Sequence, residues 1–314
     1  MPKAFVSARQ TTLAREIELT GVGVHSGAPV NIVLHPAEAD TGYRFMVTKR
    51  GQIISEIIAD VKNVKNLTLC TVIGDETGTT VGTVEHLLAA LRGLAVDNCY
   101  IEINGKEVPI MDGSSCRFVD AIDKVGLKHL NAPRKFIKVL KPVRVDDGDC
   151  WAELGPHSGF HLDVEIDFDT PIIGRQRIAH EITPGVFRNE LSRARTFGFM
   201  RDVEQLWKAG LALGASLENS VAIGEDKVIN PEGLRYNQEF VRHKMLDAVG
   251  DLSLAGLPLL CKYRSVRGGH RLNAYALQEL FKDQTSWTIV EAPRHRDMPI
   301  GAKMSQPLAM AFGK

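Results

Sequence analysis

The segment EFVRHKMLDAVGDLSLAG (239–256) holds the side chains best suited to chemistry, and its apolar residues recur at helical spacing. At about 100° per residue, His243, Asp247 and Asp251 fall within roughly 80° of one another on the helix, and Lys244 lies close to them. An imidazole and a carboxylate four residues apart can bind one metal ion from a single helix face. A solvated face with ordinary ion pairs fits the same pattern, so this helix alone leaves both interpretations open.

A second candidate is the dipeptide Glu85-His86 in TVEHLLAALRGLAV (83–96). The spacing of the leucines predicts a helix over these residues, with Thr83 as its N-cap. A histidine that holds zinc beside a glutamate that takes a proton from water is a device of metal-dependent hydrolases. Most Glu-His pairs are surface residues, so this pair is a weak signal by itself.

The other histidines and the cysteines add no further motif. His25 lies in the glycine-rich stretch GVGVHSG (21–27), but no helical pattern follows it, so it does not predict a phosphate loop. The five cysteines are odd in number and lack C-x-x-C spacing, which is typical of reduced thiols in a cytoplasmic protein. We expect ordinary histidines without a site at five further positions, His129, His157, His161, His180 and His295.

Strands followed by helices occur twice along the chain, which predicts an α+β protein of two related domains. We place the first domain at 1–130 and the second at 135–290, with the polar stretch NAPRK (131–135) between them as a linker. The tail, 291–314, is expected to be irregular. The remaining helices are predicted at about 116–127, 184–191, 202–209 and 270–283.

Composition narrows the possible partners. Hydrophobic residues make up 44% of the 314 residues, enough for a packed core. The charges balance at 38 basic and 38 acidic residues, which argues against a nucleic-acid partner. No apolar run reaches the ~18 residues of a membrane span, and the N-terminus lacks the apolar centre of a signal peptide.

Six segments in order resemble one family, the UDP-3-O-acyl-N-acetylglucosamine deacetylases, zinc enzymes of the committed step of lipid A biosynthesis. The resemblance runs from about residue 10 to residue 290. The segments that carry it are GVGVHSG (21–27), TVEHLLAAL (83–91), VPIMDGSS (108–115), SRARTFGFMRD (192–202), FVRHKMLDAVGDL (240–252) and GGH (268–270).

The resemblance implies that His86, His243 and Asp247 bind one catalytic zinc ion. Two histidines and one carboxylate leave a fourth position open, as in catalytic zinc sites. It also implies a fold in which the helices of two α+β domains are sandwiched between two outer sheets, with the site at the junction. His86 would then come from the first domain and the other two ligands from the second.

The resemblance further implies the catalytic roles. Glu85 is expected to act as general base on the attacking water. Thr196 and Lys244 are expected to help stabilise the oxyanion. His270 matches the second acid–base histidine of the family, and Asp251 would orient it and favour its charged form. The products would be acetate and a free amine on the sugar nucleotide.

The expected substrate is a UDP-linked amino sugar that carries a fatty acyl chain. Residues 197–223 follow directly on Thr196 and are the candidate wall for that chain, although an ordinary core helix is the better explanation for any one of them taken alone. Asp112, Cys70 and the nucleotide-side aromatic Phe168 are further candidates by motif context. Within the wall, the candidate contact residues are Phe197, Met200, Val203, Trp207 and Leu217.

Two departures from the family pattern lie beside His270: Gly268 stands where serine is common, and Arg271 where a small residue is common. We expect them to alter the loop and the nucleotide contacts, but they remove no catalytic group. Two alternatives stay open, a zinc amidohydrolase of another acylated amino sugar and a non-catalytic protein that binds sugar nucleotides or lipids. We expect a monomer.

Overall fold

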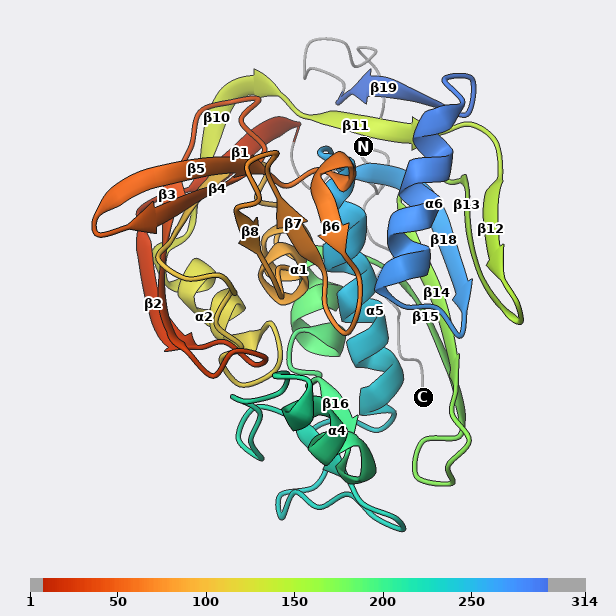
Figure 1. Cartoon of the computed structure of the whole chain (residues 1–314). Coiled ribbons are helices and arrows are strands. Elements are labelled where there is room, and N and C mark those ends of the chain that lie inside the picture. Colours follow the sequence, from red (N-terminus) through yellow and green to blue (C-terminus); the bar gives the residue numbers. More distant parts are fainter. Residues whose placement is uncertain (1–7, 293–314) are drawn as a thin grey trace, which may run out of the picture.

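The computed structural model describes residues 8–292 and has two outer sheets with helices between them (Figure 1). In the first half, five strands form a mixed sheet in the order β2-β3-β9-β4-β5, in which only β4 and β9 run parallel. Side chains alternate between buried and exposed along these strands, as expected of a sheet with one face on the core. The bounds are β2 Ile17–Val22, β3 Pro29–Pro36, β4 Tyr43–Lys49, β5 Gln52–Ile58 and β9 Cys99–Ile103.

Shorter elements complete the first half. A three-stranded sheet of β6, β7 and β8 leads into helix α1, and β1 pairs with β10. The predicted helix at about 116–127 is confirmed as α2, Cys116–Val125. The other bounds are β1 Arg9–Leu13, a 3-10 turn Val61–Asn63, β6 Val64–Asn66, β7 Val72–Gly74, β8 Thr80–Val81, α1 Glu85–Gly93 and β10 Leu127–Pro133.

The second half is built on a seven-stranded sheet whose central strand is β18. β18 pairs with β13 and β14 along Cys261–Val266 and with β11 at Leu259 and Leu260, and β12, β15 and β19 extend the sheet. The bounds are β11 Lys135–Val139, β12 Val143–Asp147, β13 Cys150–Pro156, β14 Phe160–Asp167, β15 Arg175–Glu181, β18 Leu259–Val266 and β19 Trp287–Glu291.

Two long helices of the second half lie where the sequence predicts them. α5 spans Glu239–Leu252 and continues as a 3-10 turn, Ser253–Ala255, and α6 spans His270–Lys282. Between β15 and α5 the elements are short: α3 Pro184–Val186, a π-helical turn Phe187–Leu191, β16 Phe197–Phe199, a 3-10 turn Met200–Asp202, α4 Val203–Lys208 and β17 Val221–Ile223. None of the helices within residues 8–292 is long and apolar enough to cross a membrane.

The α+β class and the sandwiched helices agree with the sequence-based expectation (Figure 1). One hydrophobic core runs from Leu13 in the first half to Leu280 in the second. Residues 131–135, predicted as a linker, are extended: β10 ends at Pro133, β11 begins at Lys135, and Arg134 between them is buried. The division into two domains stays a prediction, and the tail beyond Glu291 lies, apart from Ala292, outside the described residues.

Helices α1 and α5 meet backbone to backbone at one glycine. A Cβ atom at Gly250 of α5 would lie 2.0 Å from the carbonyl oxygen of Glu85, the first residue of α1. Only a residue without a side chain allows this approach. The contact places the start of α1 against the polar side of α5, which sets the position of the site.

Candidate active site

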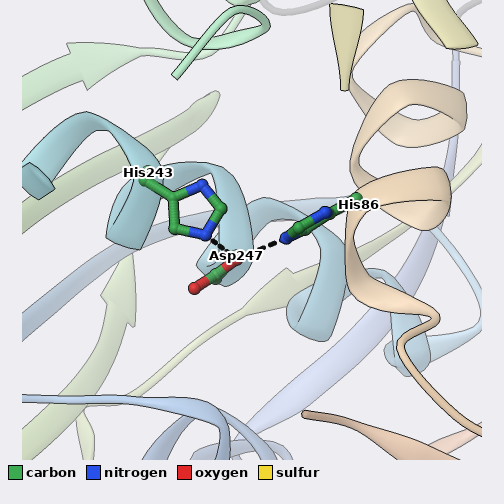
Figure 2. A group of neighbouring side chains, drawn as sticks. All are labelled: His86, His243 and Asp247. Atoms are coloured by element: carbon green, nitrogen blue, oxygen red, sulfur yellow. Dashed lines mark ion pairs between the residues drawn. The ribbon is translucent and has the colours of Figure 1, made fainter. Parts of the chain in front are cut away.

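Three candidate ligands converge between α1 and α5. His243 and Asp247 lie one turn apart on α5, and His86 is the second residue of α1 (Figure 2). Asp247 Oδ1 lies 3.6 Å from His86 Nε2 and 3.3 Å from His243 Nε2, and all three side chains are buried. Donor atoms that share one tetrahedral ion at about 2.1 Å are about 3.4 Å apart. The spacing of the three atoms therefore suits a single metal ion.

The surroundings of His243 fix its tautomer and keep its imidazole neutral, as a metal ligand requires. Its Nδ1 lies 3.0 Å from the carbonyl oxygen of Ala194, so Nδ1 carries the proton and donates to that oxygen. Nε2 then keeps its lone pair for a metal ion. Burial lowers the pKa of His243 to about 3, so the imidazole is neutral at physiological pH.

Asp247 contributes a negative charge with one free oxygen. Its Oδ2 accepts a hydrogen bond of 2.6 Å from Lys244 Nζ. Burial alone would raise the pKa of Asp247, but the neighbouring groups hold it well below its usual value, and of these groups Lys244 and His270 stay positive at neutral pH. Oδ1 has no hydrogen-bond partner among the described residues, and neither has His86 Nδ1. A buried carboxylate oxygen without a donor is costly unless a cation lies beside it.

Glu85 lies at the N-terminus of α1, beside these ligands. Its carboxylate is buried, and Oε2 accepts a hydrogen bond of 3.0 Å from the backbone N–H of Thr71. Burial raises the pKa of Glu85, although the imidazoles of His270 and His86 oppose this shift. A carboxylate with a raised pKa is a better proton acceptor near neutral pH than an ordinary glutamate.

His270 and Asp251 form the second charged pair of the site. His270 Nδ1 lies 2.8 Å from Asp251 Oδ2, and both side chains are largely buried. Burial alone would lower the pKa of His270, but the carboxylates of Asp251 and, to a smaller extent, Glu85 outweigh it and raise the pKa to about 9. The imidazole is therefore protonated at neutral pH, with Nε2–H available to another group.

Two residues that the sequence analysis missed hold Asp251 in place. The Thr71 hydroxyl donates to Asp251 Oδ1 at 2.6 Å, and the Asn273 amide donates to Oδ2 at 2.7 Å. Tyr263 in turn donates its hydroxyl to Asn273. Asn273 lies three residues after His270 on α6, and that spacing was a signal for a shared face. Nothing in the sequence around Thr71 indicates its partners.

Thr196 lies on the strip of chain that borders His243. Ala194, two residues before it, holds His243 through its carbonyl, and the ring of Phe197 lies 6.2 Å from the His243 ring. The Thr196 backbone is fixed at both ends, because its N–H donates to Gly113 and its carbonyl accepts from Val221. Thr196 thus lies in the chain between two residues that contact His243, Ala194 and Phe197.

Arg195 is another residue that the sequence analysis missed. Its guanidinium is 1% exposed and donates to Glu239, the first residue of α5, and to Glu232. The backbone N–H of Arg195 also donates to Glu239. A fully buried and paired arginine ties the Thr196 strip to α5. Arg195 lies within the family motif SRARTFGFMRD, and this position could have identified it as a candidate.

Three weaker predictions concern residues that are not among the candidate ligands. Cys70 is buried, and burial together with the Glu85 carboxylate raises its pKa to about 12, so it stays a neutral thiol. Asp112 accepts hydrogen bonds from Ser114 in its own turn and from Arg235 at 2.6 Å, which accounts for it structurally. Thr83 does not cap α1: its φ is +54°, and its hydroxyl donates to Glu107.

The candidate acyl-chain residues lie on an unusually exposed apolar segment. Helix α4 has no buried residue, and Met200, Trp207 and Leu217 are 49%, 56% and 41% exposed. Val203 is partly buried. The alternative of an ordinary core helix is therefore wrong for α4. Phe197 and Phe168 form an edge-to-face pair with ring centroids 5.7 Å apart at the end of this segment nearest His243.

The sequence as a whole is similar to one family of enzymes. A sequence model of the family described as UDP-3-O-acyl N-acetylglycosamine deacetylase matches residues 10–282. Relatives from Brucella ovis, Brucella canis and Brucella melitensis bear the name UDP-3-O-acyl-N-acetylglucosamine deacetylase and are each 51% identical over 290 residues. These matches cover 91% of this chain and 100% of each relative. The family match includes every residue of the site.

Proposed function

The chain belongs to the UDP-3-O-acyl-N-acetylglucosamine deacetylase family, and we propose that the site between α1 and α5 performs this hydrolysis. The substrate is a UDP-linked amino sugar, and the reaction releases acetate in the committed step of lipid A biosynthesis. The observation that carries the proposal is the convergence of three ligand atoms on one point beside the buried Glu85. A protein that only bound this substrate would need neither Glu85 nor His270.

Zinc suits the donor set formed by His86, His243 and Asp247. Two imidazole nitrogens and one carboxylate oxygen are borderline ligands typical of catalytic zinc. Asp247 Oδ1, which accepts no hydrogen bond from residues 8–292, and the neutral imidazole of His243 are the features that a divalent ion would satisfy. When bound here, zinc would supply Lewis acidity toward the acetamide carbonyl and toward a water molecule.

Glu85 removes the proton from the attacking water. It is the first residue of α1, and the backbone N–H of Thr71 fixes one of its oxygens. Burial raises its pKa toward the working pH, which is the condition for an efficient general base. The contact of its backbone with Gly250 keeps this carboxylate on the ligand side of α5.

Lys244 and Thr196 stabilise the negative charge that develops on the carbonyl oxygen. Lys244 stays protonated although it is largely buried, because Asp247, Asp251 and Glu85 together raise its pKa more than burial lowers it. Thr196 offers a hydroxyl from the strip that borders His243. A positioned donor of this kind contributes on the order of 3–4 kcal/mol to the stability of the transition state.

His270 donates its proton to the leaving amine. Its pKa of about 9 keeps the imidazole charged until the carbon–nitrogen bond breaks, and Asp251 fixes the ring through Nδ1. Glu85 and His270 thus have separate tasks, one group accepting a proton and the other giving one. The exposed apolar side chains of residues 197–223 would bind the fatty acyl chain of the substrate.

The test is acetate release from UDP-3-O-acyl-N-acetylglucosamine by the purified protein before and after dialysis against a chelator. We expect the activity to disappear on dialysis and to return with one equivalent of zinc. An amino-sugar substrate without the UDP group, assayed in parallel, distinguishes this activity from that of another zinc amidohydrolase. Undiminished activity in metal-free protein would contradict the proposal.

A further inference from the structure

A second group of metal-ligating side chains lies on the seven-stranded sheet. His157 Nε2 lies 3.0 Å from Glu181 Oε2, and His161 Nδ1 lies 3.5 Å from the same oxygen. One ligand atom from each of the three residues lies within 4.8 Å of the other two. The sequence analysis did not foresee that His157 and His161 lie together beside Glu181.

The strand pairing brings the three residues together. His157 stands in the short turn that joins β13 to β14, and His161 is the second residue of β14. Glu181, the last residue of β15, is the direct partner of His161 in the antiparallel register. Residues directly opposite in such a pair point to the same face of the sheet. Two of the donors thus belong to a hydrogen-bonded ladder and not to a free loop.

Gly159 lets the Glu181 carboxylate lie over the turn. A Cβ atom at Gly159 would be 1.8 Å from Glu181 Oε1, so any other residue would push the carboxylate away from the histidines. The turn is also tied to the centre of the sheet, because the carbonyl of Gly159 accepts a hydrogen bond of 2.8 Å from Cys261. The backbone therefore holds the group at a fixed spacing.

The donor distances match those of the site between α1 and α5. They are 3.0 and 3.5 Å here, against 3.3 and 3.6 Å there, and a single tetrahedral ion requires about 3.4 Å. The side chains differ in exposure: they are partly exposed here, so water can complete the coordination shell. Two imidazoles and one carboxylate favour zinc, nickel or copper over magnesium or calcium.

We propose that His157, His161 and Glu181 form a second, surface site for a divalent transition-metal ion, separate from the site of His86, His243 and Asp247. An ion bound there would join the β13–β14 turn to the end of β15. This proposal does not depend on the deacetylase activity, because no residue of the group belongs to the site between α1 and α5.

The experiment counts zinc bound to the full-length protein by equilibrium dialysis at increasing Zn²⁺ concentration. We expect His161→Ala and Glu181→Gln to bind one equivalent less than the parent while keeping the parent's deacetylase activity. His86→Ala should lose the deacetylase activity and the zinc equivalent between α1 and α5, and it should keep the zinc equivalent of the surface site. Cobalt(II) provides a second readout, since its visible absorption in His86→Ala should disappear when His161→Ala is added.

His35→Ala is the matched control. His35 is as exposed as His157, and each of its ring nitrogens faces a different carboxylate, Glu16 or Glu102, so it makes ion pairs without forming a three-donor group. It should bind as much zinc as the parent. Thermal unfolding of the metal-free proteins checks that the variants fold. Equal zinc content in folded His161→Ala, folded Glu181→Gln and the parent would overturn the proposal.

Discussion

The hydroxyl of Thr71 donates a hydrogen bond of 2.6 Å to Asp251, the carboxylate that holds His270. The backbone N–H of Thr71 also donates to Glu85, so one fully buried threonine contacts both the proposed general base and the partner of the proposed general acid. These contacts join the loop before β7 to the ends of α1 and α5. The distance between Glu85 and His270 thus depends on Thr71, a residue that takes no part in the proposed proton transfers.

The variant Thr71→Val keeps the shape and the backbone N–H of this residue but removes the hydroxyl. It leaves Asp251 Oδ1 without that donor in a buried position, which costs ~1–3 kcal/mol of stability. We expect kcat to fall by about tenfold while zinc content stays at the parental level, because no metal ligand is touched. Thr71→Ser, which restores the hydroxyl, should recover most of kcat. If Thr71→Ser is as slow as Thr71→Val, the hydroxyl has no positioning role.

Asp251→Asn should change the pH dependence of the reaction. Asp251 raises the pKa of His270 to about 9, so the protonated acid of the parent persists until the pH rises through that value. Without the carboxylate, burial is the dominant effect and lowers this pKa, so the protonated form is lost at lower pH. The basic limb of the kcat/KM profile should therefore move to lower pH by more than one unit. An unmoved basic limb would assign that limb to a group other than His270.

Substitutions of the proposed metal ligands should reduce zinc binding, whereas substitution of the proposed general base should reduce activity alone. His86→Ala, His243→Ala and Asp247→Ala should each bind zinc much more weakly, because each removes one of three protein donors. Glu85→Gln should keep the zinc ion and lose activity by roughly 10²-fold or more. The zinc content and kcat, measured on the same preparations, distinguish a ligand from a general base. Loss of zinc from Glu85→Gln would make Glu85 a ligand or a structural residue.

Gly250→Ala tests the contact between α1 and α5. The added methyl group would overlap the carbonyl of Glu85, and such overpacking costs about 1–3 kcal/mol. We expect a lower Tm together with weaker zinc binding, because α1 carries His86 away from the ligands on α5. Gly185→Ala is the control, since its methyl group would meet no atom closer than 4.0 Å. A Gly250→Ala protein with parental Tm and zinc affinity would show that the helices adjust freely.

The acyl-chain assignment is tested by chain length. Met200→Trp and Leu217→Trp enlarge exposed side chains of the candidate wall, so they should lower kcat/KM more for long acyl chains than for short ones. Zinc content should stay unchanged. The measurement is kcat/KM for substrates that differ only in acyl length. Equal losses at every length would place the acyl chain elsewhere.

Local spacing predicted the part of the site that lies on one helix. His243, Asp247, Lys244 and Asp251 recur on one face of α5, and helical periodicity is visible in a single sequence. The family resemblance was needed to join His86 to them, because that contact crosses from one half of the chain to the other.

The elements that no local pattern encodes were missed or predicted wrongly. The partners of Thr71 are set by how a loop packs on two helices, and the group at His161 is set by the β14–β15 register. Thr83 was predicted as a cap from its residue type, but tertiary contacts use its hydroxyl elsewhere and hold its φ at +54°. Contacts between side chains on different elements depend on how those elements pack, and residue spacing along the sequence does not show this packing.

The exposed apolar segment around α4 has a consequence for turnover. Deacetylation removes acetate and leaves the fatty acyl chain attached, so contacts between that chain and Met200, Trp207 or Leu217 would hold substrate and product equally well. Such contacts would strengthen the binding of the substrate. They would strengthen the binding of the product by the same free energy, so the product would dissociate more slowly. The product would then compete with fresh substrate, and the rate of the cycle would depend on how quickly the next protein or membrane takes the lipid away.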